Sequence, residues 1–239
     1  MKQISSFLLK GNYDYPASFR IIEILGIIAF TVFCILLYLQ LISPFGHTMP
    51  NWLSLALISL VLLAYFTADF ISGFVHFLGD TFGTPETPVL GPGFIKPFRD
   101  HHTDPQGIVR HDWIEVNASN CIVCLFILIP VYFFVPIHTS TIGYLTAFYL
   151  MMVVLFILCT NQFHKWAHME KPPVLIAALQ KMGLILPPDH HNVHHTAPND
   201  KYYCITCGWM NSFLFKIHFF EFSEKVIRKI FPDRTKRKA

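Results

Sequence analysis

Residues 142–170 read IGYLTAFYLMMVVLFILCTNQFHKWAHME, a long apolar run that ends in a short polar segment. Up to Cys159 the run contains no charged side chain, which is typical of a helix that crosses a membrane. Beyond it, His164 and His168 lie four residues apart and would leave one face of the same helix. This stretch therefore predicts a membrane-spanning helix with a pair of imidazole rings at one end.

The composition indicates a membrane protein throughout the chain. Of 239 residues, 53% are hydrophobic and only 14% are charged, whereas soluble globular proteins carry roughly 25% charged residues. The net charge is only +3, which argues against a nucleic-acid-binding arm. We predict an all-α integral membrane protein with four transmembrane helices. The expected spans cover about residues 21–42, 52–72, 121–136 and 142–160.

All 18 lysines and arginines would lie on one side of such a four-span protein. Positive charges favour the cytoplasmic side of a membrane, so both termini are expected in the cytoplasm. The membrane would be a bacterial inner membrane or the endoplasmic reticulum. The expected organisation is a cytoplasmic N-terminus over residues 1–20, one membrane domain over residues 21–225 and a basic tail over residues 226–239.

Histidine is unusually frequent, with 13 residues against 15 acids. His47, His138 and His218 are isolated, and we interpret them as ordinary loop or structural residues. The other ten fall on the predicted cytoplasmic face, at helix ends or in the loops between them. These ten are His76, His101, His102, His111, His164, His168, His190, His191, His194 and His195. One metal ion takes three or four protein ligands, so this number suits two ions.

The spacing of these histidines favours a non-haem di-iron site. His76 and Asp80 lie four residues apart at the end of the second span, and DHHNVHH at residues 189–195 contains two more such pairs. Zinc hydrolysis is disfavoured because the His-Glu-x-x-His motif is absent. Haem is disfavoured because the middle of every span lacks histidine. A membrane hydroxylase and a non-enzymatic metal- or haem-binding protein are the alternatives.

Two Cys-x-x-Cys pairs, Cys121/Cys124 and Cys204/Cys207, raise the question of a structural zinc site. The first pair opens an apolar segment, where its thiols would lie at or within the bilayer. We therefore interpret the cysteines as reduced, packed thiols.

Six blocks of the sequence closely resemble the Kua-type lipid desaturases. They lie between about Asp69 and Asn211 and read GFVHFLGDT (73–81), FIKPFRDHH (94–102), RHDWIEVN (110–117), NQFHKWAH (161–168), PDHHNVHHTAP (188–198) and YCITCGW (203–209). The resemblance implies a lipid desaturase domain that oxidises a 1-O-alkyl ether phospholipid to the vinyl ether of plasmalogens. A plant plastid branch of the family implies acyl-lipid desaturation as the alternative. Two departures are Cys207, where the family block has Thr, and Asn199, where members have His.

The resemblance also implies the roles of individual residues. The metal ligands would be nine of the ten histidines named above, and His111 and Asp80 match family positions either as ligands or as partners of ligands. Separately, five acids beside the histidine blocks are natural acceptors for ligand N–H groups. They are Asp100, Asp104, Asp112, Glu115 and Asp189. Four cations would bind the phospholipid headgroup or anchor the chain at the interface: Lys96, Arg99, Arg110 and Lys165.

Desaturation of this kind requires two iron ions, O2 and two external electrons. No segment looks like a fused cytochrome b5 or ferredoxin, so we expect a separate electron-transfer protein of one of these types. The basic tail from Arg228 to Lys238 could attract that carrier or anionic lipid. A solvated charged tail is the plainer interpretation.

Overall fold

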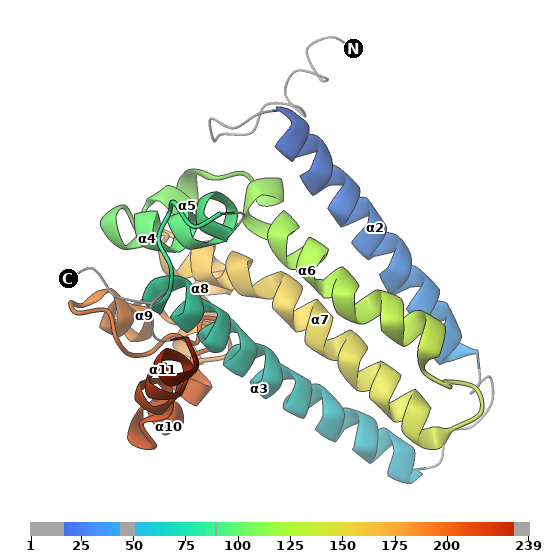
Figure 1. Ribbon diagram of the computed structural model, residues 1–239. Coiled ribbons are helices and arrows are strands. Elements are labelled where there is room, and N and C mark those ends of the chain that lie inside the picture. The colour runs from blue at the N-terminus through green and yellow to red at the C-terminus, as the bar shows by residue number, and fades with distance from the viewer. Residues whose placement is uncertain (1–16, 44–50, 89, 232–239) are drawn as a thin grey trace. The chain divides into compact units, whose positions relative to one another are not determined.

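The computed structural model describes residues 17–43, 51–88 and 90–231 (Figure 1). Within these ranges every regular element is a helix. Four helices are long and apolar enough to cross a membrane. They are α2 (Ala17–Ile42), α3 (Asn51–Thr81), α6 (Trp113–Phe134) and α7 (Thr141–Ala167). The prediction of an all-helical chain with four membrane-length helices is thus confirmed.

The remaining helices are short. They are the π-helix η1 (Gly91–Ile95), α4 (Lys96–Thr103), α5 (Gly107–Arg110), α8 (Val174–Lys181), α9 (Pro188–His195), α10 (Trp209–Lys216) and α11 (Phe219–Ile230). Most of the expected N-terminal segment, His47 and more than half of the expected basic tail lie outside the described residues.

The chain divides into two compact units, each assembled from two stretches of sequence. Unit 1 comprises Met1–Ala68 and His111–Gln162, and unit 2 comprises Asp69–Arg110 and Phe163–Ala239. The division falls inside α3 and α7, so each of these long helices contributes residues to both units.

In unit 1, α2 and α6 lie side by side (Figure 1). Gly26 permits this close approach, because a Cβ at that position would lie 2.3 Å from Cγ1 of Ile122. Leu37 and Leu128 are buried in the core of the unit. By contrast, the Phe126 side chain is 80% exposed. Large apolar side chains on the outer faces of such helices are expected where lipid covers them.

Helix α6 begins at Trp113, well before the apolar run that starts at Cys121. Its first turn is fixed by a capping box. The Asp112 carboxylate accepts a hydrogen bond from the Glu115 N–H at 3.0 Å, and the Glu115 carboxylate accepts one from the Asp112 N–H at 2.9 Å. The buried guanidinium of Arg20 pairs with Asp112 as well. These polar contacts extend the helix beyond the segment that hydropathy alone indicates.

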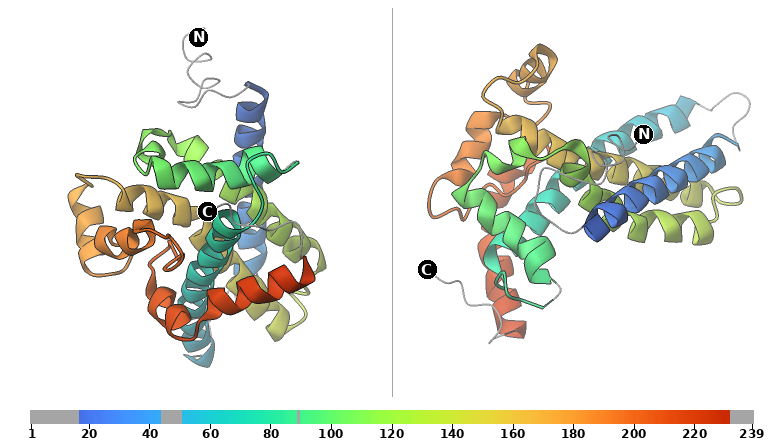
Figure 2. Two further views of the ribbon diagram at one scale, coloured as in Figure 1. Left: turned by 60° about the vertical axis from the view of Figure 1, so that its left-hand side comes forward. Right: turned by 90° about the horizontal axis from the view of Figure 1, so that it is seen from above.

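In unit 2, α11 crosses the last turns of α3 (Figure 2). Phe77 of α3, Leu214 of α10 and Phe220 of α11 are buried in one cluster with Tyr203. The ring centroids of Phe77 and Phe220 are 5.1 Å apart. This packing holds the loop between α9 and α10 against the part of α3 that carries His76 and Asp80.

Candidate metal centre

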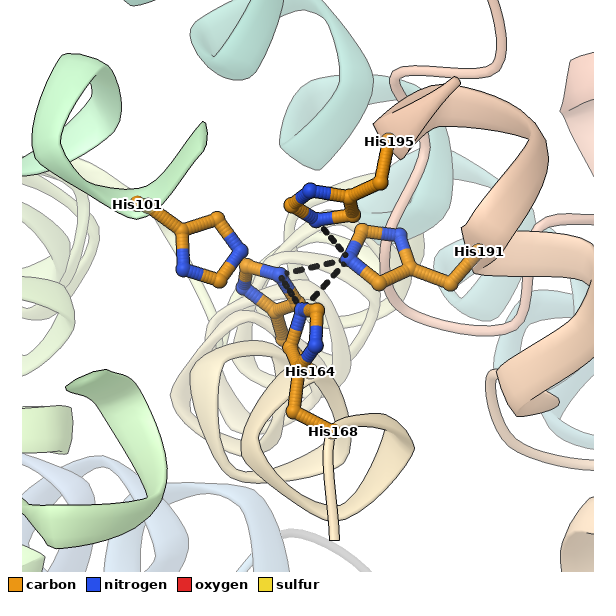
Figure 3. Close-up of side chains that lie close together, drawn as sticks. All are labelled: His101, His164, His168, His191 and His195. Carbon is orange, nitrogen blue, oxygen red and sulfur yellow. Dashed lines mark hydrogen bonds between the residues drawn. The ribbon is translucent and has the colours of Figure 1, made fainter. Parts of the chain in front are cut away.

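Five histidines of unit 2 point toward one another (Figure 3). We call them the five-histidine group: His101, His164, His168, His191 and His195. One nitrogen of each ring lies within 4.8 Å of the corresponding nitrogen of every other. Nε2 of His191 is 2.8 Å from Nε2 of His164, 2.9 Å from that of His168 and 3.0 Å from that of His195.

These nitrogen contacts cannot all be hydrogen bonds. The Nε2 atoms of His164, His168 and His191 form a triangle with sides of 2.8, 2.9 and 3.2 Å. In a neutral imidazole each nitrogen is either a donor or an acceptor. At least one side of the triangle must therefore join two donors or two acceptors. A cation removes this conflict, because metal–nitrogen bonds of about 2.1 Å in a tetrahedral site separate the ligands by roughly 3.4 Å.

A second cluster lies beside the first, and we call it the Asp80 group: His76, Asp80, His102 and His194. Oδ2 of Asp80 lies 2.9 Å from Nε2 of His102, 3.3 Å from that of His194 and 3.4 Å from that of His76. These four atoms are buried, and none has a hydrogen bond of good geometry among the described residues. Buried polar atoms normally have partners. The donor set therefore fits a metal ion.

The two groups draw their ligands from the same short helices. Helix α4 provides His101 to the five-histidine group and His102 to the Asp80 group, and α9 provides His195 and His194 in the same way. Successive residues of a helix point about 100° apart, so adjacent histidines can face two different points. The ring centroids of His76 and His164, one from each group, are 5.9 Å apart. Ions held by the two groups would be neighbours.

Burial keeps these rings in the form that binds metal. Burial and the charges of neighbouring histidines lower the pKa of His168 to about 4 and the pKa of His195 to about 3. The same causes, burial first, lower the pKa values of His101 and His191. At neutral pH these four rings are therefore uncharged, and each keeps one nitrogen lone pair free for coordination.

Backbone carbonyls of the α9–α10 loop (residues 196–208) orient two of the rings. Nδ1 of His194 lies 2.9 Å from the carbonyl oxygen of Lys201, and Nδ1 of His76 lies 3.2 Å from that of Tyr203. A carbonyl oxygen only accepts, so each Nδ1 must carry the proton. Nε2 then keeps its lone pair, directed into the Asp80 group.

Asp69 of α3 anchors the end of this loop, and nothing in the sequence analysis singled it out. The residue is fully buried. Its Oδ1 accepts hydrogen bonds from the N–H groups of Thr206, Cys207 and Gly208 at 3.1, 2.9 and 2.9 Å, and its Oδ2 accepts one from Met210 at 3.0 Å. Hydrogen bonds to a charged carboxylate are stronger than hydrogen bonds between neutral groups. The sequence does contain a signal for Asp69, because an acidic residue inside an apolar, membrane-length helix is costly unless it has partners.

Two histidines that were predicted as ligands lie outside both groups. His190 points toward Asn211, with Nε2 of the ring 3.1 Å from Nδ2 of the amide. Its ring also packs on Gly208, where a Cβ would lie 2.6 Å from the ring. His111 belongs to unit 1, and its Nδ1 lies 3.2 Å from Oε2 of Glu115. Asp80, in contrast, lies at the centre of the second group.

The predicted acidic partners and headgroup cations largely pair with one another. Asp100 forms a salt bridge with Lys96, and Asp104 forms one with Arg110, all four being exposed side chains. Asp112 and Glu115 cap α6, as described above. The other three predicted residues are Asp189 in the first turn of α9, Arg99 on α4 and Lys165 next to His164 on α7.

The six cysteines are free thiols, and neither metal group includes one. Burial raises the pKa of Cys204 well above its ordinary value. A cysteine binds zinc as its thiolate, so Cys204 is a poor zinc ligand.

Comparison with known proteins gives the reaction class. A family model described as a lipid desaturase domain matches residues 65–238, which include both metal groups. The chain belongs to the lipid desaturase family. This desaturase is 46% identical over 215 residues to plasmanylethanolamine desaturase of Myxococcus xanthus, an alignment that covers 89% of this chain and 73% of the relative. It is 38% identical over 205 residues to plasmanylethanolamine desaturase 1 of Mus musculus, covering 84% and 73% of the two chains.

A plant relative is more distant. The desaturase is 35% identical over 166 residues to chloroplastic fatty acid desaturase 4 of Arabidopsis thaliana, covering 68% of this chain and 49% of the relative. No solved structure matches the desaturase. Family membership confirms the resemblance seen in the six sequence blocks, and it makes the protein a membrane oxidoreductase that acts on a lipid.

Proposed function

We propose that this desaturase uses two iron ions, O2 and two external electrons to convert a 1-O-alkyl ether phospholipid into its vinyl ether. The observation that carries the proposal is the pair of adjoining, buried ligand groups in unit 2. Two relatives that align over most of the chain bear the name plasmanylethanolamine desaturase, which supports an ether-lipid substrate. Iron is favoured over zinc because desaturation is a redox reaction and zinc has no redox chemistry.

The proposed ligands are the nine residues of the two groups. In this proposal the five-histidine group holds one iron and the Asp80 group holds the other. Imidazole suits iron, and the single carboxylate of Asp80 supplies the one negative charge of the set. His190 and His111, which the sequence suggested as ligands, would instead support the surrounding structure through Asn211 and Glu115.

The overall reaction balances as follows. One hydrogen leaves each of two adjacent carbons of the alkyl chain, and a carbon–carbon double bond forms between them. These two hydrogens, two protons and two external electrons reduce O2 to two water molecules. Bound iron would supply the activation of O2. The chain's own side chains contribute neutral ring nitrogens in a buried setting, and the carbonyls of Lys201 and Tyr203 fix the orientation of two of those rings.

We further propose that cations on the ligand-bearing helices α4 and α7 and at the end of α5 hold the phosphate headgroup. Lys96 and Arg99 share α4 with two ligands, and Lys165 follows His164 on α7. Arg110 ends α5. A headgroup bound by Lys96, Arg99 and Lys165 would be held on the same helices as the ligands, which favours presentation of the adjoining carbons to the metals.

The orientation of the desaturase is also a proposal. The one-sided distribution of lysine and arginine supports placing both termini and the metal centre on the cytoplasmic side. A separate cytochrome b5- or ferredoxin-type protein would then deliver electrons from the same side.

The substrate proposal is tested by lipid analysis of a host that makes no vinyl ethers and is fed a 1-O-alkylglycerol. Expression of the desaturase is expected to produce acid-labile vinyl ether phospholipids, measured by mass spectrometry before and after mild acid. The His191→Ala variant serves as the inactive control. A new acyl double bond without vinyl ethers would contradict the ether-lipid assignment. It would support the alternative, acyl desaturation, which the plant relative's name favours.

A further inference from the structure

Helix α10 carries a row of exposed, large apolar side chains. Trp209, Phe213 and Ile217 follow one another at four-residue intervals, so they lie along one side of the helix and its C-terminal cap. Their exposed fractions are 42%, 55% and 52%. Leu214, next to this row on the helix, is buried and packs in the core of unit 2.

Helix α11 repeats the pattern. Phe222, Val226 and Ile230 also follow at four-residue intervals, and their exposed fractions are 66%, 38% and 63%. The buried face of the same helix carries Phe220, with Ile227 packed against the same core. The apolar residues of α11 therefore form one broad face, of which unit 2 covers one edge and leaves the other edge exposed.

Lysines flank both apolar rows. Lys216 ends α10, and Lys225 and Lys229 lie on α11 one residue before Val226 and Ile230. All three side chains are exposed. A short helix that combines large apolar residues with adjacent lysines is typical of a segment that lies in the membrane interface, because lysine can reach anionic headgroups while the apolar side chains enter the acyl region.

The start of α11 contacts the membrane-length helix α3. The ring of Phe219 lies 5.4 Å from that of Phe70 and 6.4 Å from that of Phe74. Phe70 and Phe74 belong to the C-terminal half of α3, a helix long and apolar enough to cross a membrane. Helix α11 therefore begins beside the later turns of that helix.

We infer that α10 and α11 form a membrane-interface element, in which the two apolar rows insert between lipid chains and the three lysines contact anionic headgroups. Lipid is favoured over a protein partner because the rows are edged by lysine and α11 packs against a membrane-length helix. This inference does not depend on the identity of the metal or of the substrate.

The test uses Trp209 as the reporter. The full-length variant Trp52→Phe, Trp113→Phe, Trp166→Phe retains Trp209 alone and is placed in nanodiscs of phosphatidylcholine and phosphatidylglycerol. Lipids brominated near the headgroup end of the chain are expected to quench about half of its fluorescence, and lipids brominated near the methyl end less. Circular dichroism and monodisperse elution check that the variant is folded.

The lysines are tested in the same single-tryptophan background. Lys225→Gln with Lys229→Gln is expected to reduce quenching in anionic nanodiscs to the value seen in neutral ones. The matched control is Glu221→Gln on the same helix, which should not reduce it. Trp209 fluorescence that is untouched by either brominated lipid, but fully quenched by aqueous iodide, would overturn the inference. Stronger quenching by the deep bromine would overturn it too, because α10 would then lie within the hydrocarbon.

Discussion

Replacing His191 with alanine is expected to abolish lipid desaturation and to lower the bound iron from about two ions per chain to about one. The reason is geometric, because Nε2 of His191 is within 3.0 Å of three other ring nitrogens of the five-histidine group. Removal of a group that merely hydrogen-bonds a metal ligand lowers activity or metal affinity roughly 10–100-fold. Removal of a ligand itself should have a larger effect. Elemental analysis of the purified variant and product formation measure the two effects.

The matched control is His218→Ala. This histidine is exposed and pairs only weakly with Glu221 on the surface. Its removal is expected to leave both iron content and turnover at the wild-type level. Retention of two irons and full activity by the His191→Ala variant would remove the five-histidine group from the proposed centre.

The second large effect is expected from Asp69→Asn. The oxygen of the amide can still accept hydrogen bonds. Its NH2 group, however, takes the place of Oδ2 and faces the N–H of Met210, which is also a donor. The bonds from three further N–H groups to Oδ1 also lose the strength that the carboxylate charge gives them. We expect a loss of stability of about 3 kcal/mol, seen as earlier thermal unfolding in detergent.

Asp69→Asn should also weaken metal binding, because the loop it anchors carries the carbonyls that orient His76 and His194. Iron affinity, measured by competition with a chelator, is expected to fall roughly 10–100-fold. Asp200→Asn, an exposed residue of the same loop, is the control and should change neither stability nor affinity. Equal iron affinity in the folded Asp69→Asn variant and the wild type would show that the loop does not position the ligands.

The membrane helices and most of the metal groups could be predicted from the sequence, because both depend on local patterns. Apolar runs of sufficient length predict spanning helices, and four-residue spacing predicts that His164 and His168 share a face. The spacing could not reveal how ligands divide between two groups. That division depends on the direction in which α4 and α9 present adjacent residues, such as His101 and His102.

The partners of the ligands were harder to predict, because they come from residues distant in sequence. Acids next to the histidine blocks were expected to accept ring N–H bonds, yet the carbonyls of Lys201 and Tyr203 hold two of the rings. Every residue has a backbone carbonyl, so the sequence does not indicate which carbonyl will accept a hydrogen bond from a ring. Glu115 could have been recognised as a capping residue, since Asp112-Trp-Ile-Glu115 has the capping-box spacing.

The central claim is that the two adjoining ligand groups hold two iron ions that turnover requires. Its most direct test is elemental analysis of the wild-type desaturase, purified from an iron-supplied host, combined with the activity of the same sample before and after iron chelation. The expected result is about two irons per chain, no haem absorbance, and activity that is lost on chelation and restored by ferrous iron. Full turnover in a sample that contains zinc and only traces of iron would contradict the account.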